Sequence, residues 1–223
     1  MATAAAGLKG HILDLGCGSK LYEGLLSSAS SYNGVDVETS GHSHADNKID
    51  VFYDGRVLPF DDCSFDHVVS FETFEHIFNL GEVLTEIWRV VRPGRSLVIS
   101  LPFGWDEHEA PFDIARYNTF GITAIMERHF FKVGKVIRSN GFVEAVFQLV
   151  ILRILPYEQP LSDSKLVVAA IGNFSDKLGV ADRYQAAAHE RTVLLRYGDN
   201  SEEANWRFRS QNSGRRRIVP ATV

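Results

Sequence analysis

Apolar and β-branched residues gather in short runs, and stretches with helical periodicity separate these runs. Strands are predicted at His11–Leu15, Tyr32–Val37, Lys48–Tyr53, Phe65–Phe71, Ser96–Leu101, Lys132–Arg138 and Thr192–Tyr197. Helices are predicted at Lys20–Ser28, Leu80–Val91, Thr119–His129 and around Ser162–Asn173. Strands that alternate with helices are typical of an α/β protein whose parallel sheet is covered on both faces.

The composition favours one compact domain. The chain has 223 residues, of which 45% are hydrophobic, so it can bury a core without cross-links, and its two cysteines are too few for a disulfide framework. We assign residues 1–199 to this domain, with residues 142–190 as a helical insertion before the last strand. Residues 200–223 are expected to form a polar, arginine-rich tail.

The charge distribution argues against a nucleic-acid partner. Five of the 23 bases and two of the 28 acids lie in residues 201–223, so the body before them carries 18 bases and 26 acids. Such a body is expected to repel phosphate backbones. We find no secretion signal and no apolar run long enough to span a membrane, which predicts a cytoplasmic protein.

The first chemical signal is the run Ile12–Gly18, in which an apolar strand leads to Asp14 and then to Gly16 and Gly18. Glycines at such a turn let a ligand lie against the backbone at the carboxyl end of a strand. The run departs from the dinucleotide fingerprint because Leu21 stands where the third glycine would be. Because Asp14 would repel a pyrophosphate, the turn disfavours a dinucleotide oxidoreductase and favours a cationic ligand.

Two further acids end the next two predicted strands. A carboxylate at Asp36 can accept both hydroxyls of a ribose, and Asp54 could accept the exocyclic amine of a base. Because the carboxyl ends of parallel strands share one edge of a sheet, these acids and Asp14 predict an acidic crevice for an adenosine-type ligand.

These motifs together resemble the class I S-adenosylmethionine-dependent methyltransferases, and specifically the type 11 group. The resemblance is carried in family order by Asp14–Gly18, Gly34–Asp36, Asp54–Phe60, Ser64–Val69, Phe74–Ile77 and Arg89–Gly94, and it covers about residues 11–142. It implies a doubly wound, Rossmann-like fold with a seven-stranded, mostly parallel sheet and an antiparallel last strand. It also implies S-adenosylmethionine as the cofactor and methyl donor.

The resemblance assigns roles to individual positions. It places Asp14 near the methionine amine, Gly16 and Gly18 under the methionyl and ribose portion, and Glu72 on the sulfonium side. It places Asp36 on the ribose hydroxyls and Asp54 near the adenine amine. Cys17, Val37, Gly55 and Ser70 complete the implied cofactor site.

Only about ten residues precede the first strand, where family members commonly carry a helix that covers the cofactor. Either that helix lies before this sequence, or Phe142–Leu155 or a second subunit supplies the cover. The apolar stretch Phe142–Leu155 favours a core or subunit-contact helix, which would suit a homodimer. A peripheral membrane or lipid-linked acceptor site is the alternative interpretation.

The loop after the fifth strand carries the candidate catalytic residues. We expect His108 to act as a general base, with Asp113 and Arg116 orienting it or holding the acceptor. The alternative is a structural Asp113–Arg116 ion pair with His108 capping a turn. His76 is expected to face the cleft, although a structural histidine bonded to backbone is an equal alternative.

The core of this loop, His-x-x-Pro-x-Asp-x-x-Arg-Tyr, resembles a segment of methyltransferases from bacterial surface-polysaccharide and other glycan-assembly loci. This resemblance implies O-methylation of a sugar or glycan-linked hydroxyl. Methylation of a small metabolite on nitrogen or carbon, and a catalytically inactive cofactor-binding subunit, remain alternatives. His42, His44 and Asp46 have no fourth partner in the sequence, so we predict a hydrophilic linker there and no metal site.

Overall fold

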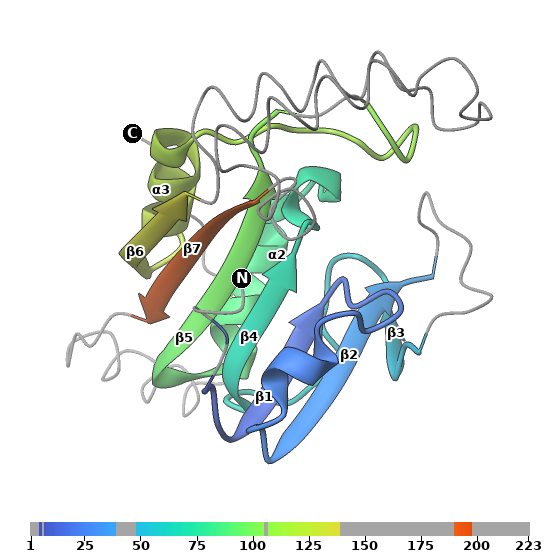
Figure 1. The fold of residues 1–223 in the computed structure, drawn as a ribbon, viewed down its shortest axis with the longest axis vertical. Coiled ribbons are helices and arrows are strands. Elements are labelled where there is room, and N and C mark those ends of the chain that lie inside the picture. Colours follow the sequence, from blue (N-terminus) through green and yellow to red (C-terminus); the bar gives the residue numbers. More distant parts are fainter. Residues whose placement is uncertain (1–4, 6, 39–47, 105–106, 139–189, 198–223) are drawn as a thin grey trace, which may run out of the picture.

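The computed structural model describes residues 5, 7–38, 48–104 and 107–138, together with the backbone of residues 190–197. Within these residues, seven strands form one sheet in the order β3-β2-β1-β4-β5-β7-β6 (Figure 1). The strands are β1 His11–Leu15, β2 Ser31–Val37, β3 Val51–Tyr53, β4 Phe65–Phe71, β5 Val91–Pro102, β6 Phe131–Arg138 and β7 Glu190–Tyr197. The α/β Rossmann-like fold expected from the sequence is therefore confirmed.

Strands β1 to β5 run parallel to one another, and β7 pairs antiparallel with both β5 and β6. The strand order reverses beside β1, which pairs with β2 on one side and with β4 on the other. In open α/β sheets such a reversal opens a crevice at the carboxyl ends of the strands, where ligands bind. The topology therefore directs attention to the ends of β1, β2, β3 and β4.

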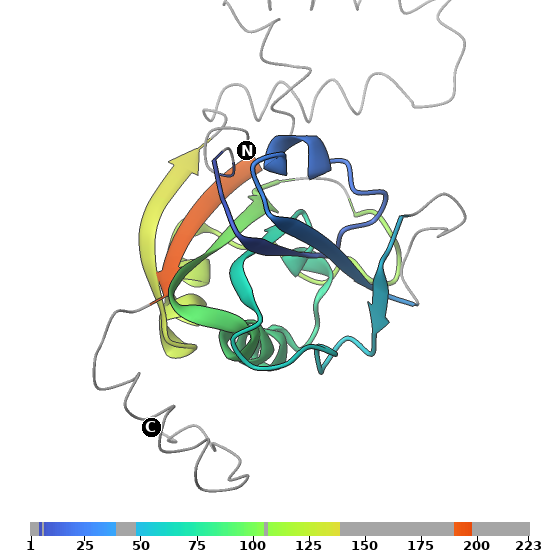
Figure 2. The ribbon, with the colours of Figure 1, turned by 90° about the horizontal axis from the view of Figure 1, so that it is seen from below.

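Two apolar layers enclose the sheet. Helices α2 Leu80–Val90 and α3 Thr119–Arg128 lie on one face, and η1 Glu23–Leu26 lies on the other (Figure 2). Side chains of β1 alternate between these layers, because Leu13 and Leu15 face α2 while Ile12 faces the layer that contains Leu26. This alternation turns Asp14 toward the same side as Ile12.

Helix α2 follows the predicted spacing closely. Five of its apolar side chains at helical spacing are almost completely buried: Leu80, Val83, Leu84, Ile87 and Val90. The helix ends at Val90, one residue earlier than predicted, and β5 begins directly at Val91. Between Val91, which pairs with Phe65, and Ser96, which pairs with His67, residues 92–95 bulge out of the ladder. Strand β5 is thus longer than the predicted Ser96–Leu101.

The predicted helix Lys20–Ser28 is wrong in extent, since only the short 3-10 helix Glu23–Leu26 forms there. Lys20 has a positive φ of 58°, and Gly24 and the serines after Leu26 are weak helix formers. Burial of Tyr22 and Leu26 against the sheet fixes the segment instead. Strand β3 is also shorter than predicted and begins at Val51.

Candidate cofactor and acceptor site

A cleft of about 890 Å³ lies at the carboxyl ends of β1 to β4. Nine of the residues that the sequence assigns to the site line it: Gly16, Cys17, Gly18, Asp36, Val37, Asp54, Gly55, Glu72 and His76. Small-molecule sites in proteins commonly enclose about 300–1,000 Å³, so the cleft is large enough for a nucleoside cofactor together with part of an acceptor. The residues that were predicted from separate motifs therefore meet in one place.

The turn after β1 brings bare backbone to the floor of this cleft. Gly16 has a φ of +73°, and a Cβ there would lie 2.3 Å from the Thr73 side chain. Only glycine fits this position without displacing Thr73. The Gly16 amide donates to the Val35 carbonyl at 2.8 Å, which ties the turn to the end of β2.

Asp36 stands at the end of β2 beside this turn. Its Oδ2 accepts the Gly18 amide at 2.9 Å, and its Oδ1 accepts the Val37 amide at 2.8 Å. These bonds fix the carboxylate in the cleft, and each oxygen keeps a further lone pair for a ligand hydroxyl. The geometry suits the ribose contact that the sequence predicts.

Asp54 lies at the mouth of the cleft, where β3 ends. Its Oδ1 accepts the Val57 amide at 2.7 Å and the Arg56 amide at 2.9 Å. These bonds from Val57 and Arg56 hold the pKa of the Asp54 carboxyl below its ordinary value. The side chain is therefore a fixed anion, and the adenine contact assigned to it stays a prediction.

Asp14 and Ser70 lie beneath the cleft, each about 1% exposed, and neither lines it. Burial raises the pKa of Asp14 to about 7, although the Tyr32 hydroxyl donates a hydrogen bond to its Oδ2. Its Oδ1 is buried without a hydrogen-bond partner. The Ser70 hydroxyl donates to the Leu15 carbonyl at 2.9 Å. The cofactor contacts assigned to both residues stay predictions.

Glu72 and His76 define the far end of the cleft, together with Glu109, Phe112 and Ile114 from the loop after β5. Glu72 has a positive φ of 49°, and its Oε1 accepts the Ser100 hydroxyl at 2.7 Å. His76 Nδ1 lies 3.2 Å from the Phe112 carbonyl, so this nitrogen carries the proton and donates it there. His76 thus bonds to backbone and also lines the cleft, and its contact with an acceptor or cofactor stays a prediction.

His108, Asp113 and Arg116 do assemble, but behind the residues that line the cleft. Arg116 donates to both oxygens of Asp113, through Nη1 to Oδ1 and through Nη2 to Oδ2 at 2.6 Å. The Arg116 bonds lower the pKa of Asp113 to about 2. Asp113 Oδ2 also accepts the His108 amide at 3.1 Å and lies 3.3 Å from His108 Nδ1. The structural ion pair therefore exists, and it supports His108 from behind.

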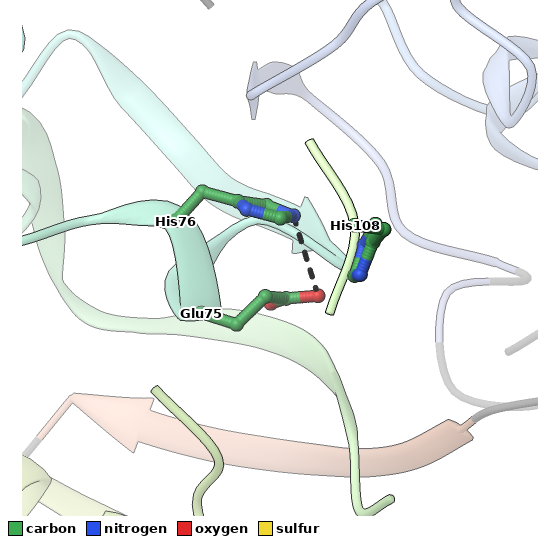
Figure 3. Close-up of side chains that lie close together, drawn as sticks. All are labelled: Glu75, His76 and His108. Carbon is green, nitrogen blue, oxygen red and sulfur yellow. Dashed lines mark ion pairs between the residues drawn. The ribbon is translucent and has the colours of Figure 1, made fainter. Parts of the chain in front are cut away.

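Glu75 is a site residue to which the sequence analysis gave no role. It belongs to η2 Phe74–His76, its side chain is 1% exposed, and neither carboxylate oxygen has a hydrogen-bond partner. Burial raises its pKa to about 7. Figure 3 shows Glu75, His76 and His108 pointing toward one another. The one local signal that could have marked it is the pair Glu75-His76, which stands between the apolar Phe74 and Ile77.

Several other cleft residues also escaped the sequence analysis, among them Tyr22, Tyr53, Thr73, Phe78 and Asn79. The remaining predictions fall on other segments of the chain. His42, His44 and Asp46, the insertion 142–190 up to the start of β7, and the tail 200–223 lie outside the described residues. Among the helices that the structure does describe, none has the length and apolar character needed to cross a membrane.

A Rossmann-like sheet with a glycine turn and acids at the ends of its first strands defines a class of nucleoside-cofactor proteins. Residues 13–99 match the family described as "Methyltransferase domain". This part of the chain is therefore similar to the S-adenosylmethionine-dependent methyltransferases, whose methyl donor is S-adenosylmethionine. The bare turn at Gly16 and the fixed carboxylate of Asp36 fit this cofactor, as does the size of the cleft.

Two curated relatives are similar to parts of the chain. A probable S-adenosylmethionine-dependent methyltransferase of Mycolicibacterium smegmatis is 28% identical over 133 residues, which are 55% of this chain and 52% of the relative. The O-methyltransferase cnsE of Penicillium expansum is 30% identical over 107 residues, which are 40% and 37% of the two chains. The matched region thus spans about half or less of each relative.

Among solved structures, a SAM-dependent methyltransferase from Aquifex aeolicus superposes with a TM-score of 0.51 at 14% identity. The superposition covers 87% of this chain and 85% of that one. At this identity the likeness concerns the fold alone. It agrees with the strand order described above.

Proposed function

We propose that this protein transfers the methyl group of S-adenosylmethionine to the hydroxyl oxygen of a small-molecule acceptor, with a sugar or glycan-linked hydroxyl as the favoured class. The observation that carries the proposal is the far end of the cleft. There, His76, Glu72 and Glu109 line the same space as the apolar Phe112 and Ile114. The cleft thus joins a nucleoside-binding half to a half that combines proton-accepting and apolar groups.

A hydroxyl acceptor explains why such groups stand there. A neutral alcohol must lose its proton when its oxygen forms the new bond, whereas a neutral amine attacks with its own lone pair. In the neutral imidazole of His76, Nε2 carries the lone pair, because Nδ1 carries the proton that is donated to the Phe112 carbonyl. The similarity to an O-methyltransferase from P. expansum supports the same choice of atom.

The reaction is an in-line displacement in which the bond from carbon to sulfur breaks as the bond from oxygen to carbon forms. The donor supplies an activated methyl group. The chain's own residues hold the donor and the acceptor in line, and such alignment alone can lower a barrier by about 7–11 kcal/mol in ideal cases. Asp36 and the turn at Gly16 hold the nucleoside, and Phe112 and Ile114 exclude water beside the acceptor. The hydroxyl proton passes to the cluster formed by His76, His108 and their carboxylates.

The proposed sugar acceptor rests on the loop after β5. Its His108, Pro111, Asp113, Arg116 and Tyr117 form the pattern that resembles methyltransferases of glycan-assembly loci. The loop is tied to the cleft, because the Glu75 carbonyl accepts the Ile114 amide at 2.9 Å. The part of the chain that resembles these enzymes is thus also the part that shapes the acceptor end.

The test is formation of S-adenosylhomocysteine by the full chain with two panels of acceptors, one of nucleotide sugars and glycans and one of small amines. We expect turnover with the hydroxyl panel and a product whose added methyl group is on oxygen. His76→Ala should lower kcat while the affinity for S-adenosylhomocysteine stays unchanged. His11→Ala, an exposed position at the start of β1 and thus at the opposite end of the strand from the cleft, is the matched control. Turnover with amines alone, or binding of the cofactor without any turnover, would overturn the proposal.

A further inference from the structure

Glu75, His76 and His108 come from two separate segments and meet at one point. Each offers one ligand atom, and these atoms lie within 4.8 Å of one another. Glu75 and His76 lie in η2 after β4, and His108 lies in the loop after β5 (Figure 3). The two segments are tied together, because the Glu75 carbonyl accepts the Ile114 and Ala115 amides at 2.9 and 3.1 Å. The convergence is therefore fixed by backbone bonds.

The Glu75 carboxylate lacks the partners that its burial requires. Its side chain is 1% exposed, and neither oxygen has a hydrogen bond. A buried polar group without a compensating bond is costly, and a buried charge is costlier still. The positive charge of Arg116 acts on Glu75, but no hydrogen bond joins Arg116 to either Glu75 oxygen. A cation held between Glu75 and its neighbours would satisfy this carboxylate.

The neighbours of Glu75 present electron pairs to the same space. His76 donates from Nδ1 to the Phe112 carbonyl, which leaves a lone pair on Nε2. This Nε2 lies 3.9 Å from Glu75 Oε1 and 3.7 Å from Glu109 Oε1. These separations are too long for hydrogen bonds. Two ligands that each lie about 2.0–2.2 Å from one ion are about 3–4 Å apart, so the spacing fits a shared cation.

The ring of His108 completes the group from the opposite side. It lies edge-on to the His76 ring, with 5.0 Å between the ring centroids and 83° between the planes. Asp113 Oδ2 lies 3.3 Å from His108 Nδ1 and is itself held by Arg116. A carboxylate behind an imidazole is the arrangement that orients metal-ligating histidines. The ion pair between Asp113 and Arg116, which the sequence analysis considered, thus holds the carboxylate that orients His108.

We propose that Glu75, His76 and His108 bind a divalent transition-metal ion at the acceptor end of the cleft. Two imidazoles and one carboxylate favour ions such as Mn²⁺, Co²⁺, Fe²⁺ or Zn²⁺ over Mg²⁺ and Ca²⁺, which prefer sets made of oxygen. Three protein ligands leave coordination positions open on the side of the cleft that His76 lines. An ion there would hold the acceptor hydroxyl beside the methyl donor and ease the loss of its proton, a role that rests on the proposed function. Because the ion then occupies the His76 Nε2 lone pair, the proton would pass to a carboxylate that lines the cleft, such as Glu109.

The test is titration of the tag-free, chelator-treated full chain with Co²⁺, followed by calorimetry and by the visible absorption of the bound ion. We expect one equivalent to bind, with new d–d absorption bands that report nitrogen and oxygen ligands. Mg²⁺ at the same concentrations should bind more weakly. Absence of Co²⁺ binding up to millimolar concentration would overturn the site.

Three variants separate this site from adventitious binding. Glu75→Gln keeps the size of the side chain, and His108→Ala changes a loop residue that is 32% exposed, so at least one is expected to fold. Each should weaken Co²⁺ binding by more than about 100-fold, beyond the 10–100-fold that loss of a supporting residue commonly causes. His11→Ala should bind Co²⁺ as the native chain does. Native affinity in both cluster variants would refute the assignment.

These experiments can refute the metal site and the hydroxyl acceptor separately. If Co²⁺ binds through the cluster but only amines are methylated, the metal site stands and the hydroxyl acceptor is wrong. If hydroxyls are methylated at an undiminished rate after chelation and no ion binds, the metal site is wrong and the acceptor stands. A rate that falls on chelation and returns with added Mn²⁺ would support both.

Discussion

Asp14→Asn is expected to remove the loss of stability that ionisation of the buried Asp14 causes as the pH rises. Burial raises the pKa of Asp14 from 3.8 to about 7 in the folded protein. The folded state therefore binds more protons than the unfolded state between these values, and stability falls as the pH rises through this range. About three pKa units at 1.36 kcal/mol each correspond to a cost of about 4 kcal/mol at pH 8, and to less than half of that at pH 5.

Asparagine has no charge to bury and can still accept the Tyr32 hydroxyl, so the variant avoids this cost. We expect its free energy of unfolding to rise relative to the native chain by about 2–3 kcal/mol between pH 5 and pH 8. Urea denaturation of both proteins at several pH values measures the difference, and contributions from the other acids cancel at each pH. Parallel curves for the two proteins would refute the burial of an ionisable Asp14.

Asp66→Asn is a control of opposite sign. Burial raises the pKa of Asp66, but hydrogen bonds from the His11 amide and from Arg92 outweigh it and hold the pKa below its ordinary value. The carboxylate also lies 3.3 Å from Arg95. This variant should therefore be less stable than the native chain at neutral pH, and the deficit should shrink as the pH falls below the ordinary range of an aspartate.

Three further outcomes follow from packing and exposure. Leu84→Ala, in the buried stripe of α2, should lower the free energy of unfolding by about 2–5 kcal/mol in urea titrations. Asp36→Ala should weaken S-adenosylhomocysteine binding by about 100-fold in calorimetry, because two charge-assisted bonds to the ribose are lost; unchanged affinity would remove the ribose assignment. Burial raises the pKa of the Cys17 thiol to about 12, so mass spectrometry should find Cys17 unalkylated in the native protein at pH 8 and alkylated after denaturation.

The elements that sequence predicted well are those whose burial depends on one local pattern. Helix α2 could be placed within one residue because its five apolar side chains repeat at helical spacing. Strand β4 was placed at its observed bounds because Phe65–Phe71 is a short apolar run with a turn on each side. The segment after Gly18 was misassigned, because its shape depends on docking Tyr22 and Leu26 onto the sheet rather than on its own propensity.

The two halves of the cleft also differ in how far the sequence predicts them. Gly16, Asp36 and Asp54 each follow a strand directly, so strand assignment alone brings them to one edge of the sheet. The acceptor half requires the loop after β5 to fold back onto η2, as the bond from the Ile114 amide to the Glu75 carbonyl shows. No local pattern encodes a contact across 39 positions, which is why Glu75 was overlooked. His108 and Asp113 could be predicted because they are a histidine and an acid in the loop after the fifth strand.

This division also predicts that the two halves of the cleft can change independently of each other. Asp36 and Gly16 are held by bonds within the ends of β1 and β2, whereas His76 and His108 are held by Phe112 and Asp113 of the loop after β5. Changes in that loop can therefore move the acceptor groups without moving the nucleoside-binding backbone. If the proposed function holds, changes in this one loop would alter the acceptor specificity and leave cofactor binding intact, because the two halves of the cleft are held by different hydrogen bonds.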